Sequence, residues 1–219
     1  MLFDLRGRRR RAVQATYLTL AVLMGGGLVF FGIGGDVSGG LFDAFSDRGG
    51  NGDVGGTIEK RIDRNEKRVS ANPVDTNALK ELVRDNYSLA AAQVPSGATG
   101  FPNEARDELQ AADRYWQRYL KAEKRKSDAS LARVVVQLYG PTALNKPKRA
   151  QEAARIIAEA DNDAPSYLQL MQYASLAGDT RTADLAGQKA VDLAPKGEKK
   201  AVKEQVKQLK SAQAAQPQG

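Results

Sequence analysis

Acidic residues next to arginines are the groups of this chain that could take part in acid–base chemistry. They alternate over Glu104–Glu108 and again at Asp113 and Arg114. Paired carboxylates act as general acid and base where their surroundings separate their pKa values. Alternating charges are also typical of solvated helix faces, and we interpret these residues in that way. A catalytic domain that uses carboxylates alone would require a paired acidic cleft, and we predict that the protein is not an enzyme.

The residue types on which most enzymes depend at neutral pH are missing. The 219-residue chain contains no histidine and no cysteine. This removes the usual general base, the commonest transition-metal ligand, thiol nucleophiles and disulfides. The glycine-rich stretch over residues 49–56 lacks the lysine of a phosphate-binding P-loop. We therefore expect no catalytic residues, no cofactor and no metal site.

A basic cluster runs directly into an apolar stretch near the N-terminus. Arg8, Arg9, Arg10 and Arg11 precede a charge-free run from Ala12 to Gly35. At about 1.5 Å per helical residue, this run reaches about 36 Å, enough to cross a hydrocarbon core of about 30 Å. Basic residues beside a first span tend to stay in the cytoplasm. The pattern predicts a single-pass protein of the bacterial plasma (inner) membrane, with a cytoplasmic N-terminus and an extracytoplasmic C-terminal domain.

Two alternatives compete with this predicted membrane anchor. A cleaved signal peptide also joins a basic start to an apolar core, but this apolar run is long and no A-x-A pattern follows it. A buried helix of a soluble protein is the second alternative. Within the run, Ala21 and Gly25 have the small-xxx-small spacing that allows close packing of spanning helices, which leaves homo-oligomerisation open.

The composition divides the chain into five segments. Residues 1–11 form the predicted cytoplasmic tail, 12–35 the transmembrane helix, 36–56 a flexible glycine-rich linker, 57–211 a helical domain and 212–219 a disordered tail. Glycine loses the most backbone entropy on ordering, which favours flexibility in the linker.

Apolar residues from Thr57 onward recur at steps of three and four, which predicts an all-α domain. A charged first helix ends before Asn72. The next four stripes lie over residues 79–90, 109–120, 131–138 and 150–157. A segment with two glycines and two prolines, residues 94–102, separates the first two of these stripes. The third helix carries Tyr115, Trp116 and Tyr119, which could form a ligand platform, although we favour core packing.

The last third of the chain has the most specific helical pattern. One stripe includes Tyr167 and Met171, the turn contains Gly178, and the partner stripe contains Gly187 before Pro195. These spacings resemble the tetratricopeptide repeat of about 34 residues, in which two antiparallel helices pack closely. Gly187 stands where that family usually has an aromatic residue, so we expect thinner packing there.

Earlier segments fit the same scheme less closely. We predict an α-solenoid of about three hairpins over residues 74–195. A final helix over residues 198–211 carries apolar residues on one side and lysines elsewhere. Terminal units of repeat stacks need a polar outer face, so we interpret this helix as a cap. Binding of lipid or another polyanion by its lysines is the alternative.

The resemblance implies a protein–protein interaction scaffold of the cell envelope that binds other proteins or extended peptides in a concave groove. Groove residues should come from the first helix of each pair, and we select Lys80, Arg84, Tyr87, Tyr139 and Gln172. The layout of tail, span and outer repeat domain also resembles the small ancillary subunit of the bacterial secretion translocon, which suggests a role in secretion or envelope assembly.

A second hypothesis follows from the net charge of +7. The protein would then be a structural tether that holds anionic envelope polymer or lipid through its basic helical faces. Nucleic acid is not an expected partner for a domain outside the cytoplasm.

Overall fold

The computed structural model describes residues 54–124 and 126–214. The predicted cytoplasmic tail, the span and most of the linker lie outside these residues, as do residues 215–219. Within the described part, no helix combines the length and the apolar character that crossing a bilayer requires. The membrane anchor therefore stays a prediction.

The described residues form an all-α structure, as predicted, with eight α-helices and one short 3-10 helix, η1 (Asn103–Ala105). The α-helices are α3 (Val54–Ala71), α4 (Thr76–Ala92), α5 (Arg106–Ala122), α6 (Ala129–Leu138), α7 (Pro147–Asp161), α8 (Ala164–Leu176), α9 (Thr180–Leu193) and α10 (Lys199–Ala214). Each helical stripe identified in the sequence corresponds to one of these helices.

Aspartates define several of the helix starts. An Asp carboxylate accepts a hydrogen bond from a backbone N–H of the first turn at four N-caps: Asp75, Asp128, Asp163 and Asp179. Such caps satisfy backbone donors that have no partner within the helix. Two of the turns that follow helices use left-handed backbone, at Asn162 with φ of 51° and at Gly178 with φ of 76°. Glycine adopts this conformation without strain.

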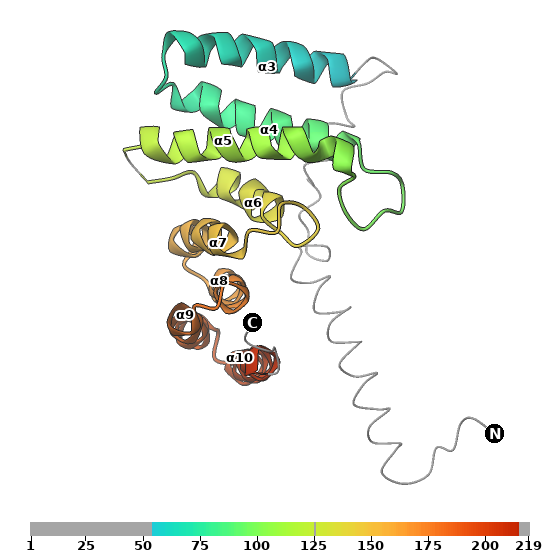
Figure 1. Cartoon of the computed structure of the whole chain (residues 1–219). Helices are drawn as coiled ribbons and strands as arrows, with labels where there is room; N and C mark the ends of the chain where they lie inside the picture. Colours follow the sequence, from blue (N-terminus) through green and yellow to red (C-terminus); the bar gives the residue numbers. More distant parts are fainter. Residues whose placement is uncertain (1–53, 125, 215–219) are drawn as a thin grey trace, which may run out of the picture. The chain divides into compact units, whose positions relative to one another are not determined.

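The helices pack mainly in sequence order and form two groups (Figure 1). Helices α3, α4 and α5 lie side by side in one layer. Helix α6 contacts both α4 and α5, and from it α7, α8 and α9 continue the stack until α10 packs on α8 and α9. In Figure 1, α6, α8 and α10 lie to the right of α7 and α9. This arrangement is solenoid-like and compatible with a helical-repeat fold.

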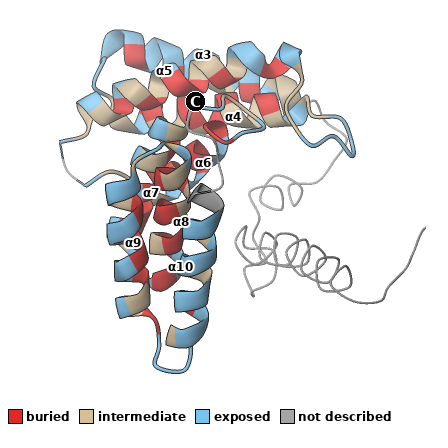
Figure 2. Ribbon diagram, turned by 60° about the horizontal axis from the view of Figure 1, so that its bottom comes forward, coloured by how far each residue is buried: buried red, intermediate tan, exposed pale blue. Residues whose placement is uncertain are grey.

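The stack changes direction at α6. Helices α7 to α10 run across the direction of α3 to α5, as Figure 2 shows from a second side. A regular series of identical hairpins would not turn in this way, so the described part is less regular than the sequence suggested. The connection from α5 leads into the ten-residue α6, a helix with six buried residues. A short helix that packs against both groups can connect helices that run in different directions.

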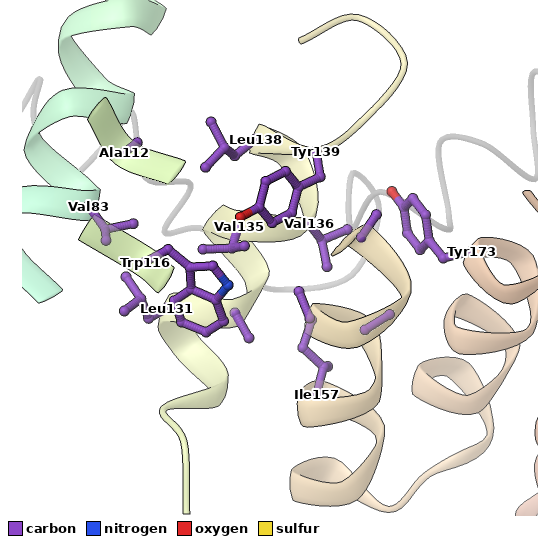
Figure 3. Packing of buried hydrophobic residues seen from close by; sticks show 14 of the residues in the cluster. Val83, Ala112, Trp116, Leu131, Val135, Val136, Leu138, Tyr139, Ile157 and Tyr173 are labelled. Atoms are coloured by element: carbon purple, nitrogen blue, oxygen red, sulfur yellow. The ribbon is translucent and has the colours of Figure 1, made fainter. Parts of the chain in front are cut away.

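Two of the three aromatic residues of α5, Trp116 and Tyr119, lie in the core, as we favoured over a ligand platform, while Tyr115 is partly buried at its edge. Trp116 is 1% exposed and Tyr119 is fully buried, and their rings stack with centroids 5.4 Å apart. Trp116 lies close to Val83 of α4 and to Leu131 and Val135 of α6 (Figure 3). Burial of each large apolar side chain contributes about 1.5–3 kcal/mol, so this cluster holds the two groups of helices together.

Packing around Gly187 is tight, and the expectation of thin packing there is wrong. A Cβ atom added at Gly187 would lie 2.9 Å from Met171 Sδ and 3.1 Å from Val206 Cγ1. Glycine at this position therefore allows α9 to approach α8 and α10 closely. The close approach of α8 and α10 fills the volume that an aromatic side chain at position 187 would otherwise occupy.

Candidate protein-binding surface

Three of the predicted binding residues share one face of α4. Lys80, Arg84 and Tyr87 are separated by steps of four and three, which places their side chains along one side of a helix. The start of α6 lies against this face. Lys80 Nζ is 3.5 Å from Asp128 Oδ2, and the Arg84 guanidinium donates to Ser130 Oγ at 3.1 Å. Both cations are half-buried in ion pairs within the domain.

Asp128 is the centre of this contact between α4 and α6. Its carboxylate accepts from the backbone N–H groups of Ser130 and Leu131 at 2.9 and 3.2 Å. Burial by itself raises the pKa of Asp128. The hydrogen bonds and the positive charges of Lys80 and Arg84 outweigh this effect, and the pKa lies below its usual value. The predicted binding cations thus have a structural role.

Tyr87 and Gln172 are the predicted residues with partly accessible side chains and no ion pair. The Tyr87 ring packs edge-on against Phe101 from the loop after α4, with centroids 5.8 Å apart. Burial raises the pKa of the Tyr87 hydroxyl. Gln172 lies on α8, in the stack that follows α6. Tyr87 and Gln172 are therefore on different groups of helices, and the structure shows no direct contact between them.

Tyr139 was predicted to line a groove, but it lies in the core. Its side chain is 1% exposed, and its hydroxyl donates to Asp113 Oδ1 at 2.6 Å. Gln117 donates to the same hydroxyl oxygen at 3.2 Å. Tyr139 follows α6 on the side of that helix that packs against its neighbours, whereas Arg133 and Gln137 on the opposite side are exposed. A partner cannot reach Tyr139 in this arrangement.

The interpretation of Asp113 as a solvated residue is also wrong. Asp113 is 7% exposed and receives three donors. Besides Tyr139, Lys146 Nζ donates to its Oδ2 at 2.6 Å and Arg149 donates to the same oxygen at 2.5 Å. The Arg149 guanidinium carbon also lies 5.9 Å from the centre of the Tyr139 ring. We refer to Asp113, Tyr139, Lys146 and Arg149 as the Asp113 cluster.

The Asp113 cluster connects α5, α6 and α7. Burial by itself raises the pKa of Asp113, but the Lys146 and Tyr139 hydrogen bonds and the two cations lower it below its usual value. A carboxylate held ionised by cations is a weak proton acceptor at neutral pH. The Asp113 cluster therefore fits a structural role, in which Asp113 links the three helices. The sequence contains one signal for the burial of Asp113. Asp113 follows Ala112 and lies three residues before Trp116, so it flanks the apolar stripe of this helix.

A second buried ion pair joins α3 to α4. Asp85 is 1% exposed, and the Arg61 Nε donates to its Oδ2 at 2.8 Å. Burial raises the pKa of Asp85 more than the Arg61 guanidinium lowers it. The two buried aspartates therefore differ, since Asp113 accepts hydrogen bonds from three side chains, whereas Asp85 accepts from the Arg61 guanidinium and is more deeply buried.

Two shallow hollows occur on the described surface. One of about 280 Å³ lies between α3, α4 and α5 and is lined by Glu59, Asp63, Asp107, Glu108, Asn86, Ile62 and Leu89. The other, of about 290 Å³, lies between α7 and the α8–α9 turn and is lined by Lys148, Gln151, Glu152, Arg155, Ala177 and Asp179. Within residues 54–124 and 126–214, no group of three or more acidic side chains has the arrangement of a metal site.

Comparisons of this chain with protein-family models, with curated proteins and with solved structures find no match. The class that the fold defines is an all-helical, solenoid-like domain.

Proposed function

We propose that this protein is a membrane-anchored helical-repeat scaffold of the bacterial cell envelope that binds other proteins or extended peptides. The observation that carries the proposal is the sequential packing of the helices, in which α6, α8 and α10 lie along one side of the stack. Stacked helical pairs present an extended surface to a partner, and such surfaces are the usual means by which repeat proteins act.

The tetratricopeptide-like assignment of the helical pairs is part of this proposal. It is supported by the α8–α9 hairpin, where the small residues Ala183, Gly187 and Ala190 allow α9 to pack closely on Met171 of α8. The left-handed Gly178 makes the turn between the two helices. The pair α6–α7 contributes the preceding unit and α10 covers the last one.

The binding surface of this proposal is the side of the stack that contains α8. Gln172 is the predicted residue on this side whose side chain is partly accessible. The test is a photo-reactive residue placed at Gln172 in living cells, with Gln188 as the matched control. Gln188 is an exposed glutamine on α9, the second helix of the same hairpin.

We expect irradiation to give discrete crosslinked species from position 172 that are absent or different at position 188. The partners are then identified by mass spectrometry. If position 172 gives no crosslink while the chain is folded, or if both positions give the same species, the proposed binding side is wrong.

The membrane attachment is supported by the sequence of residues 8–35 and requires its own test. A phosphatase that is active only outside the cytoplasm, fused after Gly219, should be active in bacteria that express the fusion well. An inactive reporter would contradict the orientation, and loss of about the first 35 residues from the mature chain would indicate a cleaved signal.

A further inference from the structure

We infer that the lysine face of α10 is a docking surface for an anionic lipid bilayer. This inference rests on the membrane attachment proposed above, and it adds an orientation: the domain lies against the membrane through its last helix. The lysine face is defined here by five residues of α10: Lys199, Lys200, Lys203, Lys207 and Lys210.

The five lysines form one continuous stripe. At 3.6 residues per turn, their positions fall within an arc of about 100° around the helix. The apolar residues Val202, Val206 and Leu209 occupy the neighbouring arc, which faces the domain. Lys200, Lys203, Lys207 and Lys210 are exposed and Lys199 is half-buried. Figure 2 shows exposed residues along the outer side of α10.

Most of the positive charge on this stripe is not neutralised within the domain. Lys210 pairs with Asp184 of α9 at 2.7 Å. Among the described residues, no salt bridge involves the other four lysines of the stripe. Glu198 precedes α10, and Glu204 lies at the edge of the stripe on the side away from the apolar residues. The stripe therefore keeps a net positive charge.

The type and the arrangement of these cations favour a lipid surface over a peptide or protein partner. All five are lysines, and a lysine ammonium acts as a point charge, whereas arginine is preferred where carboxylates are recognised by two parallel hydrogen bonds. The stripe is straight and about 16 Å long, as the rise from residue 199 to residue 210 requires. A straight row of point charges matches a plane of anionic headgroups. Each basic residue near such a plane adds to the attraction between the domain and the membrane.

The apolar side of α10 is occupied by the domain itself. Val202 is 8% exposed, and Val206 Cγ1 packs beside Gly187, 3.1 Å from the position that a Cβ atom there would occupy. Helix α10 therefore cannot insert an apolar face into lipid without leaving α8 and α9. Docking should be electrostatic, superficial and sensitive to salt.

The chain length permits this contact. Eighteen residues, 36–53, lie between the end of the predicted span and the start of α3. Fully extended, such a segment reaches about 60 Å, and as a flexible coil it averages about 24 Å. A tether of this length holds the domain near the bilayer at an effective concentration in the millimolar range, so weak attraction is sufficient for docking.

The test uses the full chain reconstituted in vesicles. The chain has no cysteine, so Gln208→Cys introduces a single labelling site at an exposed position of α10 outside the stripe. Energy transfer from a dye at this site to an acceptor on the lipid surface measures the height of α10 above the membrane. Vesicles of phosphatidylcholine alone are compared with vesicles that contain phosphatidylglycerol.

The decisive variant replaces Lys200, Lys203 and Lys207 by glutamine. A lysine near an anionic surface contributes about fivefold to binding, so loss of three should weaken docking about 100-fold. The matched control replaces three exposed lysines elsewhere, Lys60, Lys67 and Lys124, by glutamine and has the same net charge. At the five substituted positions that lie in helices, lysine and glutamine are both good helix formers, and Lys124 follows the end of α5. Circular dichroism confirms the fold of both variants.

We expect energy transfer with anionic vesicles that disappears in high salt and in the α10 variant but remains in the control. The inference is overturned if α10 stays remote from anionic vesicles, if neutral vesicles give the same signal, or if both triple variants behave alike. It is also overturned if soluble polyglutamate binds the chain while anionic vesicles do not. Flotation of the chain with vesicles in high salt separately reports the anchor, so failure of the anchor and failure of the lysine face are distinguishable.

Discussion

Replacement of Asp113 by alanine should destabilise the domain by about 2–3 kcal/mol at pH 7. The substitution leaves the Tyr139 hydroxyl, on a side chain that is 1% exposed, without its acceptor. Loss of a hydrogen bond to a buried charged group costs about 1.5–3 kcal/mol. Lys146 and Arg149 add less, because their side chains are 38% and 40% exposed and solvent screens their attraction to about 1 kcal/mol or less each. The better helix propensity of alanine offsets about 0.5 kcal/mol of the total.

Urea unfolding monitored by tryptophan fluorescence is a suitable assay, because Trp116 is the single tryptophan of the chain and is 1% exposed. With a slope of about 2 kcal/mol/M, the midpoint of unfolding should fall by about 1 M urea. Tyr139→Phe serves as the control that removes the hydroxyl alone. Because Asp113 and Tyr139 are in direct contact, the double variant should be less destabilised than the sum of the two single variants by about 1 kcal/mol.

The pH dependence of this difference tests its electrostatic origin. The pKa of Asp113 is lowered from 3.8 in the folded domain. A group with a lowered folded pKa contributes stability that is complete above the unfolded pKa and is lost as the pH falls through the folded pKa. The difference between the unmodified chain and Asp113→Ala should therefore be largest at pH 7 and smaller below pH 3.8. Equal midpoints at pH 7, or a difference that does not change at low pH, would refute this account of the cluster.

Three further predictions concern other contacts. Asp85→Asn should cost less stability at pH 7 than Asp113→Asn, since burial raises the pKa of Asp85 above 3.8. A group with a raised folded pKa contributes stability that is lost as the pH rises, so the unmodified chain should become more stable relative to Asp85→Asn as the pH is lowered. A trend in the other direction in urea titrations would contradict this prediction. Gly187→Leu should destabilise the domain by about 2 kcal/mol, because the new side chain meets Met171 and Val206; Gly197→Ala, which has open space around its Cβ, is the control that should change little. Tyr119→Phe removes the oxygen that accepts from the Asp128 N–H at 2.9 Å, and thermal unfolding should show a loss of about 1 kcal/mol; an unchanged melting temperature would mean that water replaces this acceptor.

The helices could be predicted from the sequence because the signals for them are local. Apolar spacing identified the stripe of α4 through Leu79, Leu82 and Val83, all fully buried in the structure. The segment over residues 94–102 was correctly identified as a break, since two prolines and two glycines are incompatible with a continuous helix. Trp116 was assigned to the core because it occurs at the same spacing as its apolar neighbours.

The candidate binding residues were less predictable, because helical spacing does not tell which side of a helix stays accessible. Lys80 and Arg84 lie on one face of α4, as their spacing requires, but the N-cap of α6 covers part of that face. Tyr139 follows a strongly apolar helix, and the sequence could not show that its hydroxyl meets Asp113, 26 residues earlier. An amphipathic side chain such as tyrosine is equally compatible with a groove and with a hydrogen-bonded core.

What the sequence by itself determined is that each of these helices exists and which apolar stripe it carries, and which residues of α10 are lysines on a common face. These features depend on neighbours within one or two helical turns. What only the tertiary structure decided is the change of direction at α6, the burial of Asp85 and Asp113, and the close approach at Gly187. Each of these depends on contacts between residues far apart in the chain, where packing and desolvation, rather than local propensity, set the free energy.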